Sequence, residues 1–472
     1  MTELPTGKGA RATKAVGALA PASLKLLTSM ATTLLQSPEQ TRELLQRRHE
    51  ELADGVVDML GELRGGAMKI GQLASFVDVE LIPTEHRETY QRKLARLRDA
   101  APPMEWPKVR RVLEREWETP VESLFEDFEH DAAAAASIGQ VHRAVLADGR
   151  KVAVKVQYPE VARALRADVD TAASVATVLT PLGKAMMPGL EPRVVADELR
   201  ERLLEELDFE LEAQNQRAFA RAYRGHPFIL VPPVVSELCR ERVLVSEWVD
   251  GVGFDEMRAL PDAQRDRIGA IVHRFYLGAI DWVGRFNTDP HPGNYLLRRD
   301  GSIAFLDFGN VKLVDPGWLQ MSKRLLAAVI AGDAEGVARE LDALGYVHRV
   351  DSLDRKAMLA QARAGSDWFA CDRKLTIDRD YVARTIAALT SADSARTSFA
   401  IARHLKIPRE EIWIRRVQVG VLAVLGQLRA TGNWHRTASE FIFGDAPQTD
   451  LGRAEHAFFA GRGITVQQAA SR

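Results

Sequence analysis

The stretch that decides the fold of this chain is Asp289-Pro290-His291-Pro292-Gly293-Asn294, followed thirteen residues after Asn294 by Asp307-Phe308-Gly309. Phosphoryl transfer needs an acid beside the nucleophile or the γ-phosphate, and oxygen ligands that hold Mg²⁺ on the phosphates. Two aspartates and an asparagine in this order can supply both. Asp289 or Asn294 alone would be an ordinary residue of a turn rich in proline and glycine. Asp307 at this distance makes a turn alone a poor explanation.

A β-hairpin pattern lies between the two motifs. Tyr295–Leu297 and Ile303–Leu306 are short apolar runs on either side of Asp300-Gly301, a dipeptide favoured in tight hairpin turns. An Asp, an Asn five positions later, a hairpin and then Asp-Phe-Gly is the order in which protein kinases carry their catalytic and metal loops. The order therefore predicts a kinase-like site for phosphoryl transfer.

Such a site also needs a cation for the α- and β-phosphates, normally a lysine on the strand after the hairpin that covers the nucleotide. Val141–Leu146 and Lys151–Val156 are β-type runs that flank Asp148-Gly149, so a second hairpin is predicted. Lys155 lies near the end of the apolar run. Lysines at strand edges are common, and it is the place of Lys155 in the order that favours a role in binding.

That lysine needs a carboxylate on a following helix. Leucines recur at every fourth residue from Leu199 to Leu211 and predict one long helix, whose acids include Glu206, Asp208 and Glu212. Asp208 and Glu212 share a face at the i,i+4 spacing. Most acids of such a helix lie in solvent, and the residues alone do not choose the one that points inward.

The segment that would cover the nucleotide is rich in alanine instead of glycine. It runs from Ala132 to Gln140, five alanines followed by Ser-Ile-Gly-Gln. Alanine has a narrower φ range than glycine and adds a methyl group where the chain would lie over the phosphates. A short helical alanine tract is the alternative on propensity alone.

The other segments read as a small α+β lobe between helical regions. Residues 1–115 read as mostly helical, because apolar residues recur on one helical face from Leu44 to Ile70. Two further strands are predicted at Val234–Leu238 and Val243–Glu247. The pattern then turns helical again and continues to about Leu428.

Composition and charge exclude several classes of protein. The chain has 472 residues, 46% hydrophobic and 27% charged, which excludes a disordered or fibrous chain. Its net charge of −2 gives no global attraction for nucleic acid, and we expect no nucleic-acid partner. Cys239 and Cys371 are the only cysteines, which excludes a disulfide framework and a four-thiolate metal site.

No segment reads as a signal peptide or a transmembrane helix. The run from Thr171 to Leu190 is long enough to span a bilayer, but prolines, a glycine and a lysine interrupt it. The segment Glu455–Gly463 near the end cannot cross a bilayer either. We expect a cytoplasmic protein whose attachment to the inner face of the membrane, if it occurs, is peripheral.

Four motifs in this order resemble those of the UbiB/AarF/ADCK family of atypical, protein-kinase-like proteins. They are Lys69-Ile70-Gly71-Gln72 as the family's KxGQ motif, the Ala-rich loop Ala134–His142 with Lys155 on the next strand, the ExD helix Glu206–Ala213, and the two loops quoted first. Any one motif is weak evidence, whereas the ordered set is highly specific. The resemblance is dense from about Leu52 to Val314.

The resemblance implies an α+β, two-lobed protein-kinase-like fold with a helical N-terminal extension packed over the active site. The expected parts are a helical extension with the KxGQ motif at 1–115, a kinase-like N-lobe at 116–248, a helical C-lobe at 249–436 and a C-terminal tail at 437–472. ATP and Mg²⁺ are the expected cofactors.

The resemblance also implies roles for single residues. Asp289 would be the catalytic aspartate, and Asn294 and Asp307 would be the metal ligands. Lys155 would bind the α- and β-phosphates, with Glu212 as its partner on the helix.

Three further groups of site residues follow from the same resemblance: Ala135, Ala136 and Ser137 over the nucleotide; Glu247, Trp248 and Val249 at the adenine-binding hinge; and Lys69 and Gln72, which would meet Glu206 and Asp208. Family members often carry a histidine before the catalytic aspartate, whereas this chain has Asn287-Thr288.

The function that the resemblance implies is that of an ATP-binding enzyme, either an ATPase or a small-molecule or lipid phosphotransferase, that supports isoprenoid-quinone or related lipid metabolism. An isoprenoid lipid or a membrane surface would be its partner besides ATP. Two alternatives stay open: a Ser/Thr protein kinase, and a nucleotide-sensing pseudokinase that acts as a binding module.

Overall fold

The structure is a computed structural model that describes residues 104–136, 138–159, 201, 204–205, 207–345, 354–390 and 409–464. It divides into two compact units: Met1–Val121, Glu129–His142 and Lys155–Leu207 form the first, and Glu122–Phe128, Arg143–Val154 and Asp208–Arg472 form the second. The Lys69–Gln72 motif, Ser137 and Glu206 lie outside the described residues. The expected domain boundaries stay predictions.

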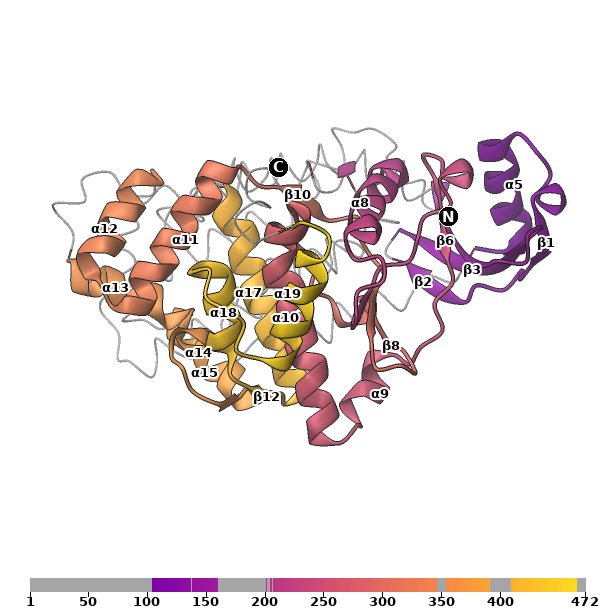
Figure 1. Ribbon diagram of the computed structural model, residues 1–472. Coiled ribbons are helices and arrows are strands. Elements are labelled where there is room, and N and C mark those ends of the chain that lie inside the picture. Colours follow the sequence, from indigo (N-terminus) through magenta and orange to yellow (C-terminus); the bar gives the residue numbers. More distant parts are fainter. Residues whose placement is uncertain are drawn as a thin grey trace, which may run out of the picture. The chain divides into compact units, whose positions relative to one another are not determined.

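One sheet has the strand order β1-β3-β4-β6, with β2 paired to β3 (Figure 1). Its strands are β1 (Phe125–Phe128), β2 (Ala134–Ala136), β3 (Gly139–Leu146), β4 (Lys151–Gln157) and β6 (Val243–Glu247). The predicted hairpin is confirmed, because Gly149 has a φ of 82° in the turn between β3 and β4. The alanine tract lies in a strand and not in a helix, since Ala134–Ala136 pairs with β3.

The predicted strand at Val234–Leu238 is wrong. Val234 makes an isolated bridge to Ser246, and Ser236–Leu238 forms a turn of 3₁₀ helix. Two prolines, Pro232 and Pro233, come just before and have no N–H to donate to a neighbouring strand. The apolar run therefore touches the sheet at its edge without extending it.

Helix α8 spans Phe209–Ala222 and begins later than the leucine repeat predicts. Asp208 is its N-cap, and the carboxylate of Asp208 accepts a hydrogen bond from the N–H of Leu211 at 3.0 Å. Leu207 lies in a turn before the cap. A capping aspartate takes a first-turn N–H and has extended backbone, so the continuous helix expected through Leu207 is wrong at this point.

The second unit is mainly helical and is built around α10 (Asp262–Val283). The helices that follow are α11 (Pro316–Ala331), α12 (Ala334–Ala343), α13 (Arg355–Ala364), α14 (Asp367–Ala370), α15 (Arg379–Thr390), α17 (Arg409–Leu428), α18 (Trp434–Ile442) and α19 (Asp450–Ala460). Helices α17 and α18 pack against α10 (Figure 1). The prediction that helical pattern continues to Leu428 is confirmed, and helices continue beyond that point.

Short strands join the helices of the second unit to its loops. They are β5 (Ile229–Leu230), β7 (Arg285–Asn287), β8 (Tyr295–Leu297), β9 (Ile303–Phe305), β10 (Val311–Leu313), β11 (Leu375–Thr376) and β12 (Thr431–Gly432). Strands β8 and β9 are antiparallel, and Gly301 between them has a φ of 79°. The hairpin predicted between the two decisive motifs is therefore confirmed.

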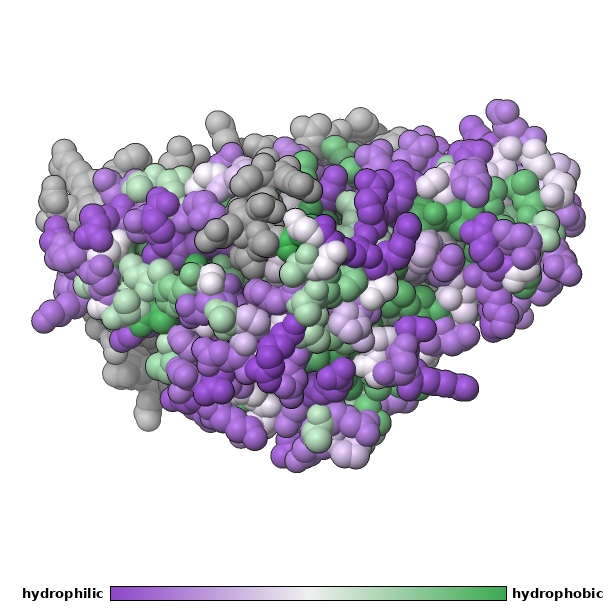
Figure 2. All heavy atoms as spheres, viewed as in Figure 1, coloured by the Kyte–Doolittle hydropathy of each residue, from purple (hydrophilic) through white to green (hydrophobic). Residues whose placement is uncertain are grey.

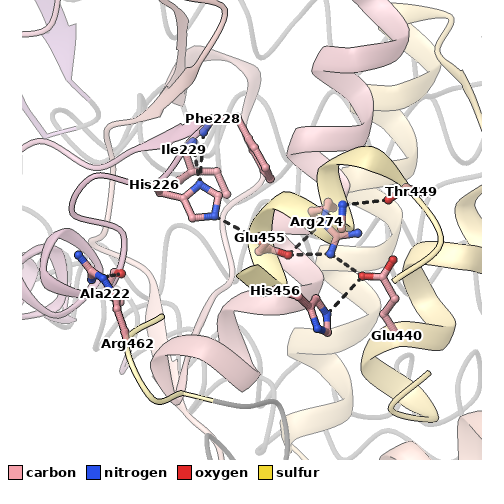
Figure 3. A network of polar contacts seen from close by, with 11 residues as sticks. Ala222, His226, Phe228, Ile229, Arg274, Glu440, Thr449, Glu455, His456 and Arg462 are labelled. Carbon is pink, nitrogen blue, oxygen red and sulfur yellow. Dashed lines mark hydrogen bonds and ion pairs between the residues drawn. The ribbon is translucent and has the colours of Figure 1, made fainter. Parts of the chain in front are cut away.

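A buried ionic cluster fastens α18 and α19 to α10 (Figure 3). Arg274 of α10 contacts Glu440 of α18 at 2.5 Å and Glu455 of α19 at 2.7 Å, and all three side chains are fully buried. His226 lies 3.6 Å from Glu455, and His456 lies 3.5 Å from Glu440. Residues beyond 437, expected as a tail, thus include helices that are packed on the core.

Hydrophilic side chains cover most of the face shown in Figure 2, with hydrophobic ones scattered among them. Among the described residues, no helix combines the length and the apolar character that crossing a membrane requires.

Candidate catalytic and metal-binding site

Asn287 joins the two loops that carry the predicted site. It is the last residue of β7, and β7 pairs with β10, the strand that follows the Asp-Phe-Gly motif in the sequence. The Asn287 side chain accepts a hydrogen bond from the N–H of Asp289 at 3.0 Å and donates one to the carbonyl of Asp307 at 2.9 Å. Asn287 is 2% exposed, so the side chain that makes this bridge is buried. Family members often have a histidine before the catalytic aspartate. In this chain Asn287 lies there and sets the spacing of Asp289 and Asp307.

Asn294 lies between Asp289 and the strand that leads to Asp307. Its side-chain amide donates to a carboxylate oxygen of Asp289 at 3.1 Å. Its own carbonyl accepts a hydrogen bond from the N–H of Leu306, the residue before Asp307, at 3.0 Å. The three residues predicted for catalysis and metal binding are therefore brought together within the second unit.

Arg416 is a site residue that the sequence did not reveal. It lies on α17, and its guanidinium contacts the second carboxylate oxygen of Asp289 at 2.8 Å. The two side chains are 19% and 26% exposed, so both are within reach of solvent and of a ligand. An ion pair from a helix more than a hundred residues away fixes the direction in which the Asp289 carboxylate points.

Two buried tyrosines hold the loop that carries Asp289 through a chain of hydrogen bonds. The hydroxyl of Tyr276, on α10, donates to the carbonyl of Asp289 at 2.9 Å. The hydroxyl of Tyr295 donates to that of Tyr276 at 3.2 Å. Burial raises the pKa of both tyrosines above the usual value, which keeps both hydroxyls protonated. Helix α10 thus holds the backbone of Asp289 in place through the hydroxyl of Tyr276.

The Asp-Phe-Gly loop is tied to α8. Phe308 is fully buried and packs against Phe219 of α8 with ring centroids 4.8 Å apart. The amide of Asn215, also on α8, donates to the carbonyl of Phe308 at 3.3 Å. A Cβ placed on Gly309 would lie 3.4 Å from Asp307 Oδ1 and 3.6 Å from Glu212 Oε2. Glu212 therefore lies beside the loop that carries Asp307.

The acids that the sequence left open have different surroundings. Glu212 is 3% exposed, whereas Asp208 is exposed and caps α8. Lys155 is half-buried on β4 in the first unit, and its pairing with Glu212 stays a prediction. Of the two described acids, Glu212 is the one that burial favours as an inward-facing carboxylate.

The alanine loop lies in the first unit. Ala135 pairs with Gln140, and Ala136 pairs with Gly139. Ala135 is exposed, whereas Ala136 is half-buried. A Cβ on Gly139 would lie 2.1 Å from the carbonyl oxygen of Val156, so β3 needs glycine where it passes β4. The roles of Ala135 and Ala136 over a nucleotide stay predictions.

The predicted hinge follows β6. The N–H of Glu247 donates to the carbonyl of Pro233 at 2.8 Å, and that of Trp248 donates to the carbonyl of Lys151 at 2.9 Å. Both amides are engaged within the protein, which leaves Val249 as the hinge residue whose amide can serve an adenine ring. The adenine contact itself stays a prediction.

The donor set suits Mg²⁺ that is shared with phosphates. Mg²⁺ takes one or two protein oxygens and completes its octahedron with water and substrate phosphates. Asn294 and Asp307 offer one amide oxygen and one carboxylate. Two such oxygens fit a Mg²⁺ ion whose remaining ligands are water and phosphates.

Taken together, the sheet, the helical region, the asparagine-bridged aspartates and the Asp-Phe-Gly loop define a protein-kinase-like protein. The model of the ABC1 atypical kinase-like domain matches residues 96–341. The chain belongs to this family, to which the UbiB/AarF/ADCK resemblance already pointed.

Several curated relatives are similar to this chain. The Activity of bc1 complex kinase 1 protein of Arabidopsis thaliana, a chloroplast protein, is 33% identical over 65% of this chain and 45% of its own. The mitochondrial atypical kinase coq-8 of Caenorhabditis elegans is 28% identical over 84% of this chain and 52% of its own. The AarF domain-containing protein kinase 1 of Mus musculus is 32% identical over 76% and 66%, respectively.

The chain spans about half the length of the curated relatives it matches. Among solved structures, that of Rv3197 from Mycobacterium tuberculosis, in complex with erythromycin, superposes with a TM-score of 0.60. It is 33% identical, and the match covers 84% of this chain and 97% of that one.

Proposed function

We propose that the chain is an enzyme that uses MgATP, either as an ATPase or as a phosphotransferase for a small molecule or lipid of isoprenoid-quinone or related lipid metabolism. Membership of an atypical kinase family supports the use of ATP. The resemblance to the UbiB/AarF/ADCK family supports isoprenoid-quinone or related lipid metabolism as the setting.

The observation that carries the proposal is the hydrogen-bonded set around Asp289. Asn287 holds Asp289 and Asp307 at a fixed spacing, and Asn294 lies between them. In phosphoryl transfer the protein contributes positioning and charge stabilisation more than covalent chemistry. A set that is bridged and partly shielded from solvent provides that positioning before the nucleotide binds.

Each group then has a task when MgATP is bound. Mg²⁺ neutralises charge on the phosphates, and Asp307 and Asn294 would hold it there. Asp289 would accept the proton of the attacking hydroxyl or water, and Arg416 orients its carboxylate. Lys155 would hold the α- and β-phosphates, with Glu212 as its predicted partner.

Two other functions are distinguished by one set of assays. ATP hydrolysis is measured with and without vesicles that contain an isoprenoid alcohol, and a generic Ser/Thr protein acceptor is tested in parallel. Hydrolysis that the vesicles stimulate, with no label on the protein acceptor, supports the proposal. Efficient labelling of the acceptor would favour a protein kinase. Binding of MgATP without turnover would favour a pseudokinase. Asp289→Asn sets the background, and Asp342→Asn, an exposed site on α12, is the matched control.

Binding of a macrolide should be tested in a separate assay, because the solved structure that is 33% identical to this chain is a complex with erythromycin. Isothermal titration of this chain with erythromycin, with and without MgATP, tests whether the two ligands compete. Competition would place the macrolide at the nucleotide site, and independent binding would place it elsewhere.

A further inference from the structure

A polar pocket lies in the second unit, where α10 begins beside α9 (Figure 1). Its volume is about 710 Å³, within the range of roughly 300–1,000 Å³ that ligand pockets usually have. The walls come from the end of α9 (Phe254–Arg258), the starts of α10 and α15, and the end of α17. The charged side chains that the structure describes in these walls are Arg258, Arg265, Arg379, Arg429, Asp378 and Asp380.

Arg265 holds three of these walls together. Its side chain is only 9% exposed. Its Nε donates to the carbonyl of Leu260 at 3.0 Å, and a second guanidinium nitrogen donates to the carbonyl of Leu428, at the end of α17. The third nitrogen contacts the carboxylate of Asp262. The connection between α9 and α10, the start of α10 and the end of α17 are thereby fixed to one another.

Arg379 and Arg429 lie on neighbouring segments of the wall. Strands β11 and β12, which pair with each other, lie just before α15 and just after α17, and the N–H of Ile377 donates to the carbonyl of Ala430 at 2.9 Å. Arg379 follows Ile377 by two residues, and Arg429 comes directly before Ala430. The backbone of both arginines is therefore held in place before a ligand binds, which lowers the entropy cost of binding.

The same two arginines are unpaired and unfavourably placed. Both side chains are exposed, and neither makes a hydrogen bond or an ion pair within the part of the chain that the structure describes. Arg379 is the first residue of α15, where the positive end of the helix dipole disfavours a cation. Arg429 has a φ of 52°, a left-handed conformation in which a residue with a Cβ is strained. Two unpaired cations that are placed against local preference at one pocket indicate a role in binding.

The acids around the pocket offset its positive charge only in part. Asp255 and Asp262, which pair with Arg258 and Arg265, have side chains that are 92% and 89% exposed, so water screens both carboxylates. The carboxylate of Asp378 accepts an N–H of α15 at 2.7 Å and caps that helix. Because arginines outnumber aspartates in the walls, the pocket favours a ligand with more than one negative charge.

We propose that this pocket binds a doubly charged phosphate group, of a soluble molecule or of a lipid headgroup, through Arg258, Arg379 and Arg429. The planar guanidinium fork matches the geometry of phosphate oxygens and binds two of them at once. The site is separate from the one proposed for MgATP. Tyr276, which holds the backbone of Asp289, lies about 16 Å along α10 from Arg265, so the proposal does not depend on the proposed function.

Binding is tested on the full chain by isothermal titration with pyrophosphate, without Mg²⁺ and at low ionic strength. Wild type should bind pyrophosphate, and Arg379→Gln and Arg429→Gly should each weaken binding about tenfold, because each removes a charged hydrogen-bond donor. Arg299→Gln, at an exposed arginine outside the pocket, is the matched control and should bind as wild type does. No binding to wild type, or equal affinity in wild type and both pocket variants, would overturn the proposal.

A second variant separates this pocket from the predicted nucleotide site. Lys155→Ala should keep the pyrophosphate binding that Arg379→Gln and Arg429→Gly weaken, because Lys155 belongs to the first unit and does not line the pocket. Binding that Lys155→Ala abolishes and the two pocket variants leave unchanged would place the phosphate at the nucleotide site and would overturn the proposal.

The melting temperature of Arg429→Gly distinguishes binding from a structural role. Glycine adopts a positive φ without the strain of a Cβ, so the melting temperature should not fall while the affinity does. A clearly lower melting temperature would show that Arg429 serves the fold, and would overturn its assignment to the ligand.

Vesicle co-sedimentation identifies what carries the phosphate. Vesicles of phosphatidylcholine, with and without phosphatidic acid, are compared for wild type and Arg379→Gln. Sedimentation that requires phosphatidic acid and is lost in Arg379→Gln supports a lipid headgroup as the ligand. Pyrophosphate binding without such sedimentation supports a soluble phosphate. Equal sedimentation of both proteins would overturn the assignment of the headgroup to this pocket.

Discussion

The unfolding free energy should fall as the pH drops, and the buried His273 should account for part of the fall above pH 5. His273 is 5% exposed and lies on α10, where burial holds its pKa at about 3. In the unfolded chain its pKa is about 6.5. Because the folded state disfavours the protonated ring, the stability is complete above pH 6.5 and is lost as the pH falls from there toward 3.

The magnitude follows from the difference between the two pKa values. Between pH 6.5 and pH 5.0 only the unfolded chain takes up the proton, and each pH unit is worth about 1.4 kcal/mol. His273 should therefore cost about 2 kcal/mol of stability on acidification from pH 7.5 to 5.0. His226, whose pKa burial also lowers, acts in the same direction.

Urea unfolding at pH 7.5 and pH 5.0, followed by tryptophan fluorescence, measures this cost. His273→Gln removes the titrating ring, so its loss of stability between the two pH values should be about 2 kcal/mol smaller than in wild type. His435→Gln, at a half-buried histidine that is not enclosed by the core, should behave as wild type does. An identical pH dependence in wild type and His273→Gln would refute the reasoning.

Three further outcomes are expected. Arg274→Met leaves Glu440 and Glu455 buried without their cation and should cost about 3–5 kcal/mol in urea unfolding; a loss below about 1 kcal/mol would contradict the importance of the cluster. Arg416→Ala should lower kcat for ATP hydrolysis about tenfold or more at a nearly unchanged KM for ATP, and Arg267→Ala, at an exposed position on α10, provides the control. Gly139→Ala should lower the melting temperature markedly, because its Cβ would overlap the carbonyl oxygen of Val156; an unchanged melting temperature would disprove that close approach.

Local chemistry in the sequence predicted the hairpins and the order of the loops. Asp148-Gly149 and Asp300-Gly301 specify tight turns because each glycine takes a positive φ, and both hairpins form as expected. The prediction of a strand at Val234–Leu238 was wrong. It rested on the β-type composition of the run and did not consider that the two prolines before it have no N–H group for strand pairing. The leucine repeat likewise did not reveal that Asp208, directly after Leu207, caps α8 and interrupts the helix.

The parts of the site that the sequence did not reveal depend on long-range packing. Arg416 reaches Asp289 from α17, and Tyr276 reaches it from α10. No local spacing relates these residues, so only the folded structure brings them together. The choice of Glu212 over Asp208 depends on burial, which a helical repeat of acids does not encode. Asn287 was visible as a departure from the family pattern, but its two hydrogen bonds were not.

The central claim is that Asp307 and Asn294 hold Mg²⁺ on a bound nucleotide, and the most direct measurement is the affinity for ATP with and without Mg²⁺ by isothermal titration. Wild type should bind MgATP, and Asp307→Asn should lose most of the Mg²⁺-dependent part, because the carboxylate that would hold Mg²⁺ is gone. Asp342→Asn, at an exposed position on α12, should bind as wild type does. Equal Mg²⁺-dependent affinity in wild type and Asp307→Asn would contradict the claim.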